Sequence, residues 1–85
     1  MRGAETFRKV PRMQIEFLVR GEHIQLDQLL KATGLVHSGG AAHAAVEAGQ
    51  VSVDGVQESR KRAKLRPGQV VSFQGAVIRL GLAEA

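Results

Sequence analysis

The sequence contains no cysteine, no tryptophan and no tyrosine, and only two of its 85 residues are proline. Without cysteine the chain can form neither a disulfide framework nor a thiolate metal site. This composition fits a reducing compartment, and we expect a cytoplasmic location. Three phenylalanines are the only aromatic residues, too few for the base-stacking platforms of many proteins that bind single-stranded nucleic acids. No apolar run approaches the roughly 20 residues needed to cross a bilayer, so we expect no membrane partner.

The residues left to build a core are mainly leucine, valine, isoleucine and alanine, in a chain long enough for one domain. We expect that domain to span residues 13–81. Residues 1–12 show no hydrophobic periodicity and contain Pro11, which predicts a flexible N-terminal arm. We expect residues 82–85 to be a frayed C-terminus.

Positive charge is unevenly distributed along the chain, whose formal net charge is +4. Residues 1–12 sum to +3 and residues 60–66 to +5, so the remainder sums to −4. The cations of the second group are Arg60, Lys61, Arg62, Lys64 and Arg66. Such a run is either a solvated loop or a surface for a polyanion, and charge alone leaves both interpretations open.

Hydrophobic periodicity predicts short helices and strands. Residues 13–19 alternate apolar and polar side chains, as in a strand with one buried face. Residues 24–33 carry leucines at the spacing of a short helix, and residues 39–48 predict an alanine-rich helix. Asp54-Gly55 between valines predicts a hairpin turn, and residues 70–73 and 76–80 predict two strands joined at Gln74-Gly75. These elements predict an α+β domain, with two short helices packed on a small, mostly antiparallel sheet.

The start of the second predicted helix combines a capping residue with two glycines. Ser38 is a favourable N-cap, and Gly39 and Gly40 remove side chains from the first turn. Because a helix N-terminus presents unpaired N–H groups and partial positive charge, a phosphate could approach the backbone closely here. The alternative is that Ser38 only caps the helix and the glycines only permit a tight turn.

Three histidines raise the question of a metal site or a catalytic site. His37 and His43 are six residues apart, His23 is distant, and no carboxylate cluster accompanies them, whereas a zinc site needs three or four converging ligands. Ser38 next to His37 lacks an orienting carboxylate. We therefore expect no catalytic residue, metal, cofactor or small-molecule substrate, and interpret His43 with Glu47 as an exposed helix pair or as a histidine facing phosphate.

The order of these elements resembles the RNA-binding domain named after ribosomal protein S4, whose fold is called the αL motif. The resemblance covers about residues 24–73 and depends on SGGAAHAAVEAGQVSVDG (residues 38–55) followed by ESRKRAKLRPGQ (residues 58–69). These stretches look most like the small stand-alone bacterial members. The resemblance implies RNA binding, and it implies that the basic run lies near the start of the second helix.

The sequence departs from the pattern of many family members at three positions. Gln25 stands where an arginine often precedes Leu-Asp, and Gly39 stands where an arginine often follows the capping serine. His43 stands where the Ser-Gly-Gly variant is expected to carry lysine. These differences bear on the choice of RNA target more than on the fold.

We therefore expect a non-catalytic RNA-binding protein, ribosome-associated and monomeric, that recognises structured RNA such as ribosomal or transfer RNA by backbone charge and shape. The alternative is a protein-interaction or accessory module of a ribonucleoprotein assembly without direct RNA contact. The residues expected to contact RNA are Ser38, Gly39, Gly40, His43, Arg60, Lys61, Arg62 and Lys64.

Overall fold

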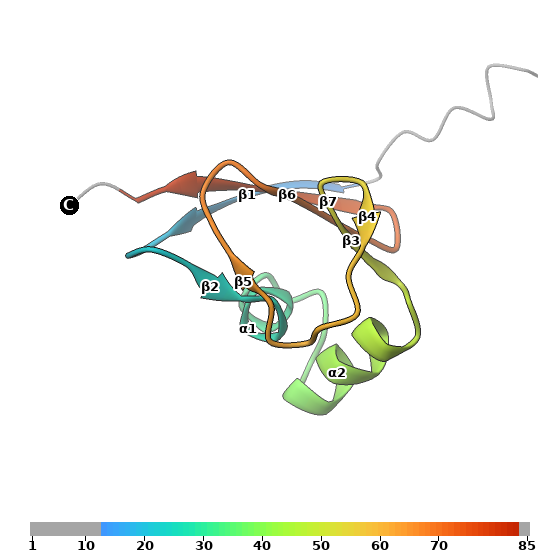
Figure 1. Ribbon diagram of the computed structural model, residues 1–85. Helices are drawn as coiled ribbons and strands as arrows, with labels where there is room; N and C mark the ends of the chain where they lie inside the picture. Colours follow the sequence, from blue (N-terminus) through green and yellow to red (C-terminus); the bar gives the residue numbers. More distant parts are fainter. Residues whose placement is uncertain (1–12, 84–85) are drawn as a thin grey trace, which may run out of the picture.

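A computed structural model describes residues 13–83 of the chain. The predicted N-terminal arm, residues 1–12, lies outside the described residues. In chain order the elements are β1 (Met13–Val19), β2 (Ile24–Gln25), α1 (Leu26–Ala32), α2 (Gly39–Glu47), β3 (Val51–Val53), β4 (Val56–Gln57), β5 (Lys64–Leu65), β6 (Val70–Phe73) and β7 (Ala76–Leu82). Both helices lie on the same side of the main sheet (Figure 1).

The main sheet has five strands in the order β1-β7-β6-β3-β4. Three of its four pairings are antiparallel, which confirms the predicted mostly antiparallel sheet. The exception is the parallel pairing of β1 with β7, which runs from Met13 opposite Ala76 to Val19 opposite Leu82. A parallel pair needs a long crossover connection, and here both helices and strands β2 to β6 form that connection.

Two hairpins, β3–β4 and β6–β7, build four of the five strands of this sheet, and both turn where the sequence predicts. Asp54 and Gly55 have φ values of 52° and 83°, and Gln74 and Gly75 have 49° and 84°. Positive φ at both central residues is the signature of a type I′ turn, which suits the right-handed twist of the flanking strands. Asp54 also accepts a hydrogen bond from the backbone N–H of Val70 at 2.9 Å, so its side chain ties the first turn to β6.

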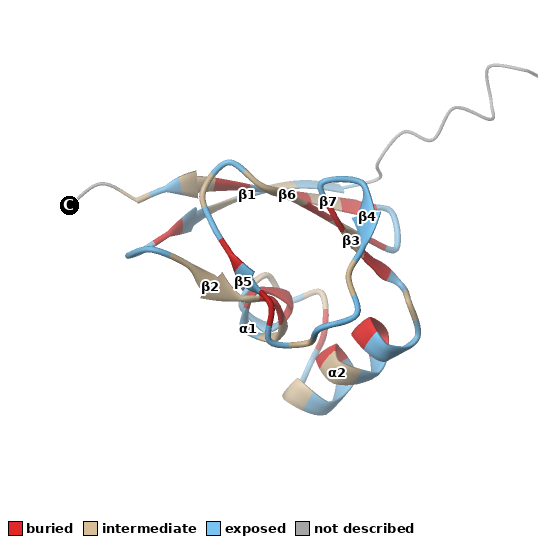
Figure 2. Ribbon diagram, viewed as in Figure 1, coloured by how far each residue is buried: buried red, intermediate tan, exposed pale blue. Residues whose placement is uncertain are grey.

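The core fills the layer between the sheet and the two helices. α1 contributes three fully buried leucines, whereas α2 contributes mainly alanines, which let it pack closely. From the sheet come buried residues of β3, β6 and β7, and Figure 2 shows buried residues on both helices and on the strands of the sheet. The largest fully buried side chains are Leu26, Leu29, Leu30, Val46, Val51, Leu65, Val71 and Ile78, with Val19 from β1. No helix within residues 13–83 is long and apolar enough to span a membrane.

Two predicted boundaries were wrong because pairing between distant segments decided them. The first helix begins at Leu26, not at residue 24, because Ile24 and Gln25 form β2 and pair antiparallel with Leu65 and Lys64 of β5. At the C-terminal end, β7 continues to Leu82, and the Ala83 N–H donates to the Val19 carbonyl at 2.9 Å. Residues 82 and 83 are therefore held against β1 and are not frayed.

Candidate nucleic-acid interface

The start of α2 is capped as the sequence predicts. Ser38 has extended backbone angles, and its Oγ accepts a hydrogen bond from the Ala41 N–H at 3.1 Å. A Cβ added at Gly39 would meet no atom within 4 Å, and one added at Gly40 would meet only Ser38 Oγ at 3.8 Å. Neither glycine has a positive φ. Neither crowding nor backbone strain therefore requires glycine at these two positions, and the first turn is open to an approaching group.

The second part of the candidate interface is residues 60–66, called here the basic segment. Its backbone is fixed against the start of α1, because the Ala63 carbonyl accepts from Leu26 N–H at 2.9 Å and the Lys61 carbonyl from Asp27 N–H at 3.0 Å. The side chains of Ala63 and Leu65 are buried, at 5% and 2% exposure. The basic segment is therefore anchored in the core by two apolar residues, and this alternation directs its cations outward.

The cations of the segment remain accessible in this arrangement. Arg62, Lys64 and Arg66 are exposed, and Lys61 is half-buried. The Arg60 side chain is 77% exposed and pairs with Glu58, whose carboxylate accepts from Arg60 Nε at 3.0 Å. Hydrogen bonds from the Arg60 side chain and backbone lower the pKa of Glu58, and the carboxylate in turn raises the pKa of Arg60. At neutral pH, Glu58 therefore offsets part of the positive charge at the beginning of the basic segment.

Asp27 connects the basic segment to α2. Its backbone N–H donates to Lys61, as described above, and its Oδ2 lies 3.0 Å from Nε2 of His43 on α2. The Asp27 side chain is 13% exposed and the His43 side chain 29%. The expected pairing of His43 with Glu47 is wrong, because the α1–α2 packing offers His43 a less exposed carboxylate across the helix interface. His43 lies one helical turn beyond Gly39, so Asp27 joins the two parts of the candidate interface.

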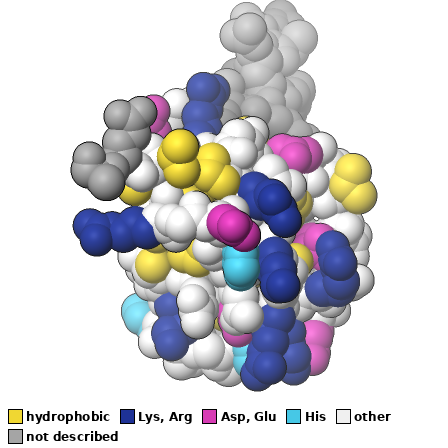
Figure 3. Space-filling model, turned by 60° about the vertical axis from the view of Figure 1, so that its left-hand side comes forward, with side chains coloured by type: hydrophobic (Ala, Val, Ile, Leu, Met, Phe, Trp, Pro, Cys, Tyr) yellow, Lys and Arg dark blue, Asp and Glu magenta, His cyan; other side chains and the backbone are white. Residues whose placement is uncertain are grey.

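The far end of the basic segment is also held. The Arg66 N–H donates to Gln69 Oε1 at 2.7 Å, and Gln69 Nε2 donates to Asp54 Oδ2 at 3.3 Å. The turn at Asp54-Gly55 and the basic segment are thus linked through the side chains of Gln69 and Asp54. Figure 3 shows Lys and Arg side chains gathered over part of one face, with Asp, Glu and His side chains among them.

The residues named from the sequence fall into two connected groups, the start of α2 with His43 and the basic segment. Sequence reasoning missed Asp27 as their junction, although it lies in the Leu26-Asp27 pair that matches the family pattern. It also missed the anchors Ala63 and Leu65, whose signal was the alternation of apolar and basic residues from 62 to 66. Within residues 13–83, no three His, Asp or Glu side chains come together as a possible metal site.

A capped alanine-rich helix, a leucine-rich helix and a basic segment whose strand β5 pairs with β2 are the parts of an S4 domain. The chain belongs to the S4 domain family, whose sequence profile matches residues 17–80. This confirms the resemblance seen in the sequence and extends it in both directions.

Two similar proteins are both called YbcJ. The one from Escherichia coli strain K12 is named provisionally as an RNA-binding protein, and the other, from Shigella flexneri, is uncharacterised. Each is 51% identical over 53 residues, which cover 62% of this chain and 76% of the relative. The solution structure of E. coli YbcJ superposes with a TM-score of 0.61 at 39% identity, covering 87% of this chain and 92% of that one. That structure is described as an αL motif involved in RNA binding, which confirms the predicted fold.

Proposed function

We propose that this protein binds RNA without catalysing a reaction, through the start of α2 and the basic segment acting as one surface. The observation that carries this proposal is the Asp27 junction, which joins His43 on α2 to the backbone of Lys61. Phosphate groups are the expected ligands, because the first turn of α2 offers backbone N–H groups and the segment offers exposed cations. The proposed contacts remain Ser38, Gly39, Gly40, His43, Arg60, Lys61, Arg62 and Lys64.

We propose further that the RNA is structured, as ribosomal and transfer RNAs are, and that the protein acts as a monomer in the cytoplasm, associated with ribosomes. The support is that the two parts of the surface are fixed in relative position by hydrogen bonds and a buried anchor. A rigid set of phosphate contacts favours an RNA whose phosphates are themselves fixed by folding. The proposed domain is residues 13–81, with β7 continuing to Leu82.

A second function is an accessory module that contacts protein in a ribonucleoprotein assembly. The observation in its favour is a set of exposed apolar side chains on β1 and β7. Met13, Leu18 and Leu82 are 50%, 59% and 58% exposed, and such exposure is common at protein interfaces. This function predicts little salt-dependent binding to RNA.

The test uses two double variants that remove equal charge from different places. Lys61 and Arg62 are changed to Ala in one variant, and Lys31 and Arg79 in the other, because the second pair is exposed and lies outside the proposed contacts. Each protein is titrated with unfractionated transfer RNA at several salt concentrations. We expect the first variant to bind at least tenfold more weakly, and log affinity to fall less steeply with log salt, since each lost phosphate contact removes about 0.7–0.9 from the slope.

The RNA affinity of the control variant should stay within about threefold of the parent's. The charges it removes lie outside the proposed contacts and act only at long range, where salt screens them. Equal losses in the two variants would contradict a defined site. If the parent shows no salt-dependent binding to transfer RNA or ribosomal RNA, the accessory function is favoured instead.

A further inference from the structure

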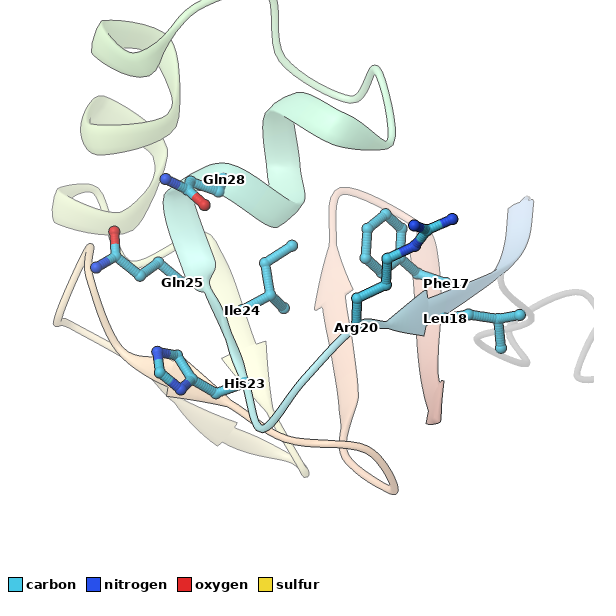
Figure 4. A pocket seen from close by; sticks show the side chains of 7 residues that line it. All are labelled: Phe17, Leu18, Arg20, His23, Ile24, Gln25 and Gln28. Carbon is cyan, nitrogen blue, oxygen red and sulfur yellow. The ribbon is translucent and has the colours of Figure 1, made fainter. Parts of the chain in front are cut away.

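A cavity of about 420 Å³ lies beside the proposed RNA surface, between the end of β1 and the start of α1. Its volume is within the range of about 300–1,000 Å³ that is common for small-ligand sites. Figure 4 shows Phe17 and Arg20 at one end, Ile24 in the middle and Gln28 across from them, whereas His23 and Gln25 point to the other side of β2. The lining residues used below are Phe17, Arg20, His23, Ile24, Gln25 and Gln28.

The polar side chains of this cavity, those of Arg20, His23, Gln25 and Gln28, make no side-chain hydrogen bond or ion pair with any residue in the described range 13–83. Each carboxamide offers both donors and an acceptor, and the guanidinium offers donors in a plane. Phe17 and Ile24, both half-buried and packed against the core, provide the apolar part of the lining. The cavity therefore combines a flat apolar group with several hydrogen-bonding groups that have no partner within residues 13–83.

One residue at the edge of the cavity is a neighbour of the basic segment. Gln25 lies opposite Lys64 in the β2–β5 pairing, and the neighbouring Leu26 N–H donates to the Ala63 carbonyl. An RNA whose phosphates contact Lys64 therefore places its next nucleotides close to the cavity mouth. Unpaired bases in RNA loops are typically recognised by stacking on an aromatic ring or a guanidinium and by hydrogen bonds to the base edge.

We propose that this cavity holds one unpaired nucleobase of the bound RNA. Phe17 and Arg20 contact the face of the base, and the carboxamide of Gln28 binds its edge. The inference rests on the proposed RNA function and adds to it a specificity that the phosphate contacts cannot supply. It implies a preference for a structured RNA with an accessible loop over a fully paired one.

The test compares hairpin RNAs that share one stem and have the same number of phosphates. Four hairpins carry a loop of a single base type, one for each base, and a fifth carries an abasic loop. We expect the parent protein to bind the best base-containing hairpin about tenfold or more tightly than the abasic one, which is the scale of one stacked base. This ratio should stay nearly constant between low and high salt, although both affinities fall, because the phosphate number is equal.

Two variants assign the preference to the cavity. Gln28→Ala changes an exposed helix residue, and Phe17→Leu keeps apolar packing but removes the ring. We expect each to reduce the ratio below about threefold without weakening binding to the abasic hairpin. Gln14→Ala, on the outward side of β1, is the matched control and should leave the ratio unchanged. If Phe17→Leu does not fold, Gln28→Ala still tests whether the base preference comes from the cavity.

A ratio near one in the parent protein, with salt-dependent binding to every hairpin, overturns the base pocket and leaves the proposed RNA function standing. A ratio that Gln28→Ala and Phe17→Leu do not alter also overturns it, because the base then binds elsewhere. Absence of binding to all five hairpins overturns both proposals. The variant carrying Lys61→Ala and Arg62→Ala should weaken binding to all hairpins by a similar factor and preserve the ratio.

Discussion

The start of α2 and the basic segment are both proposed to contact phosphate, but they are held by different interactions. The start of α2 depends on a contact between near neighbours, in which Ser38 Oγ accepts from Ala41 three residues later. The basic segment depends on contacts with residues more than 30 positions away, through the hydrogen bonds from Leu26 and Asp27 and the burial of Leu65. A local site can be altered by one substitution in one turn, whereas a site built by tertiary contacts keeps its backbone when its charged side chains are removed.

The largest expected effect comes from removing the anchor of the basic segment. Leu65→Ala should lower the free energy of unfolding by about 2–5 kcal/mol, because it leaves a cavity where a leucine is only 2% exposed. Urea denaturation measures the change. Val56→Ala, at a strand residue that is 70% exposed, should cost less than about 1 kcal/mol. Similar losses in the two variants would mean that the segment is not anchored in the core.

The next largest effect is expected at the start of α2. Gly40→Glu should weaken RNA binding about tenfold or more, because a carboxylate would occupy the place proposed for a phosphate. The fold should tolerate it, since a Cβ at this position meets only Ser38 Oγ at 3.8 Å and an acidic residue suits the first turn of a helix. Gly40→Gln is the neutral control of nearly equal size. If glutamate and glutamine reduce affinity equally, the effect is steric and the phosphate site is contradicted.

Capping and binding by Ser38 can be separated in the same way. Ser38→Ala should lower the free energy of unfolding by about 0.5–2 kcal/mol, because the Ala41 N–H loses its partner. Ser38→Asp should restore stability, since aspartate is an equally good cap, but it should weaken RNA binding through its charge. Thermal unfolding and RNA titration of both variants provide the two measurements. An aspartate variant with parental RNA affinity would restrict Ser38 to capping.

The smallest expected effect comes from removing the negative charge that offsets part of the basic segment. Glu58→Gln removes the carboxylate that pairs with Arg60, and we expect RNA affinity to rise about twofold at neutral pH because one more positive charge is uncompensated. Gln can still accept the hydrogen bond from the Arg60 N–H. Glu16→Gln, an equal charge change on the outward side of β1, is the control and should have less effect. Equal increases would show that net charge alone controls affinity.

The same pair has a defined pH dependence. Because Arg60 lowers the pKa of Glu58, the pair contributes to stability above the ordinary carboxyl pKa and loses that contribution as the pH falls through the lowered value. The contribution is small, since the arginine is largely exposed and screened by solvent. The gain in RNA affinity from Glu58→Gln should therefore disappear in acid, where Glu58 in the parent protein is already neutral.

Local sequence determined the helices, the two type I′ turns, the cap of α2 and the position of the basic residues. These features depend on neighbouring residues: Asp54-Gly55 accepts positive φ, and Ser38 reaches an N–H three positions along the chain. For the same reason, the sequence alone was enough to name both parts of the candidate RNA surface.

Tertiary structure decided how those parts meet. The parallel pairing of β1 with β7 and the pairing of β2 with β5 join segments roughly 40 to 60 positions apart, and no local pattern specifies such partners. These pairings moved the start of α1 to Leu26 and extended β7 to Leu82. Packing of α1 against α2 gave His43 the carboxylate of Asp27 in place of Glu47. A side chain pairs with the partner that folding brings within reach, and that partner can lie far from it in the sequence.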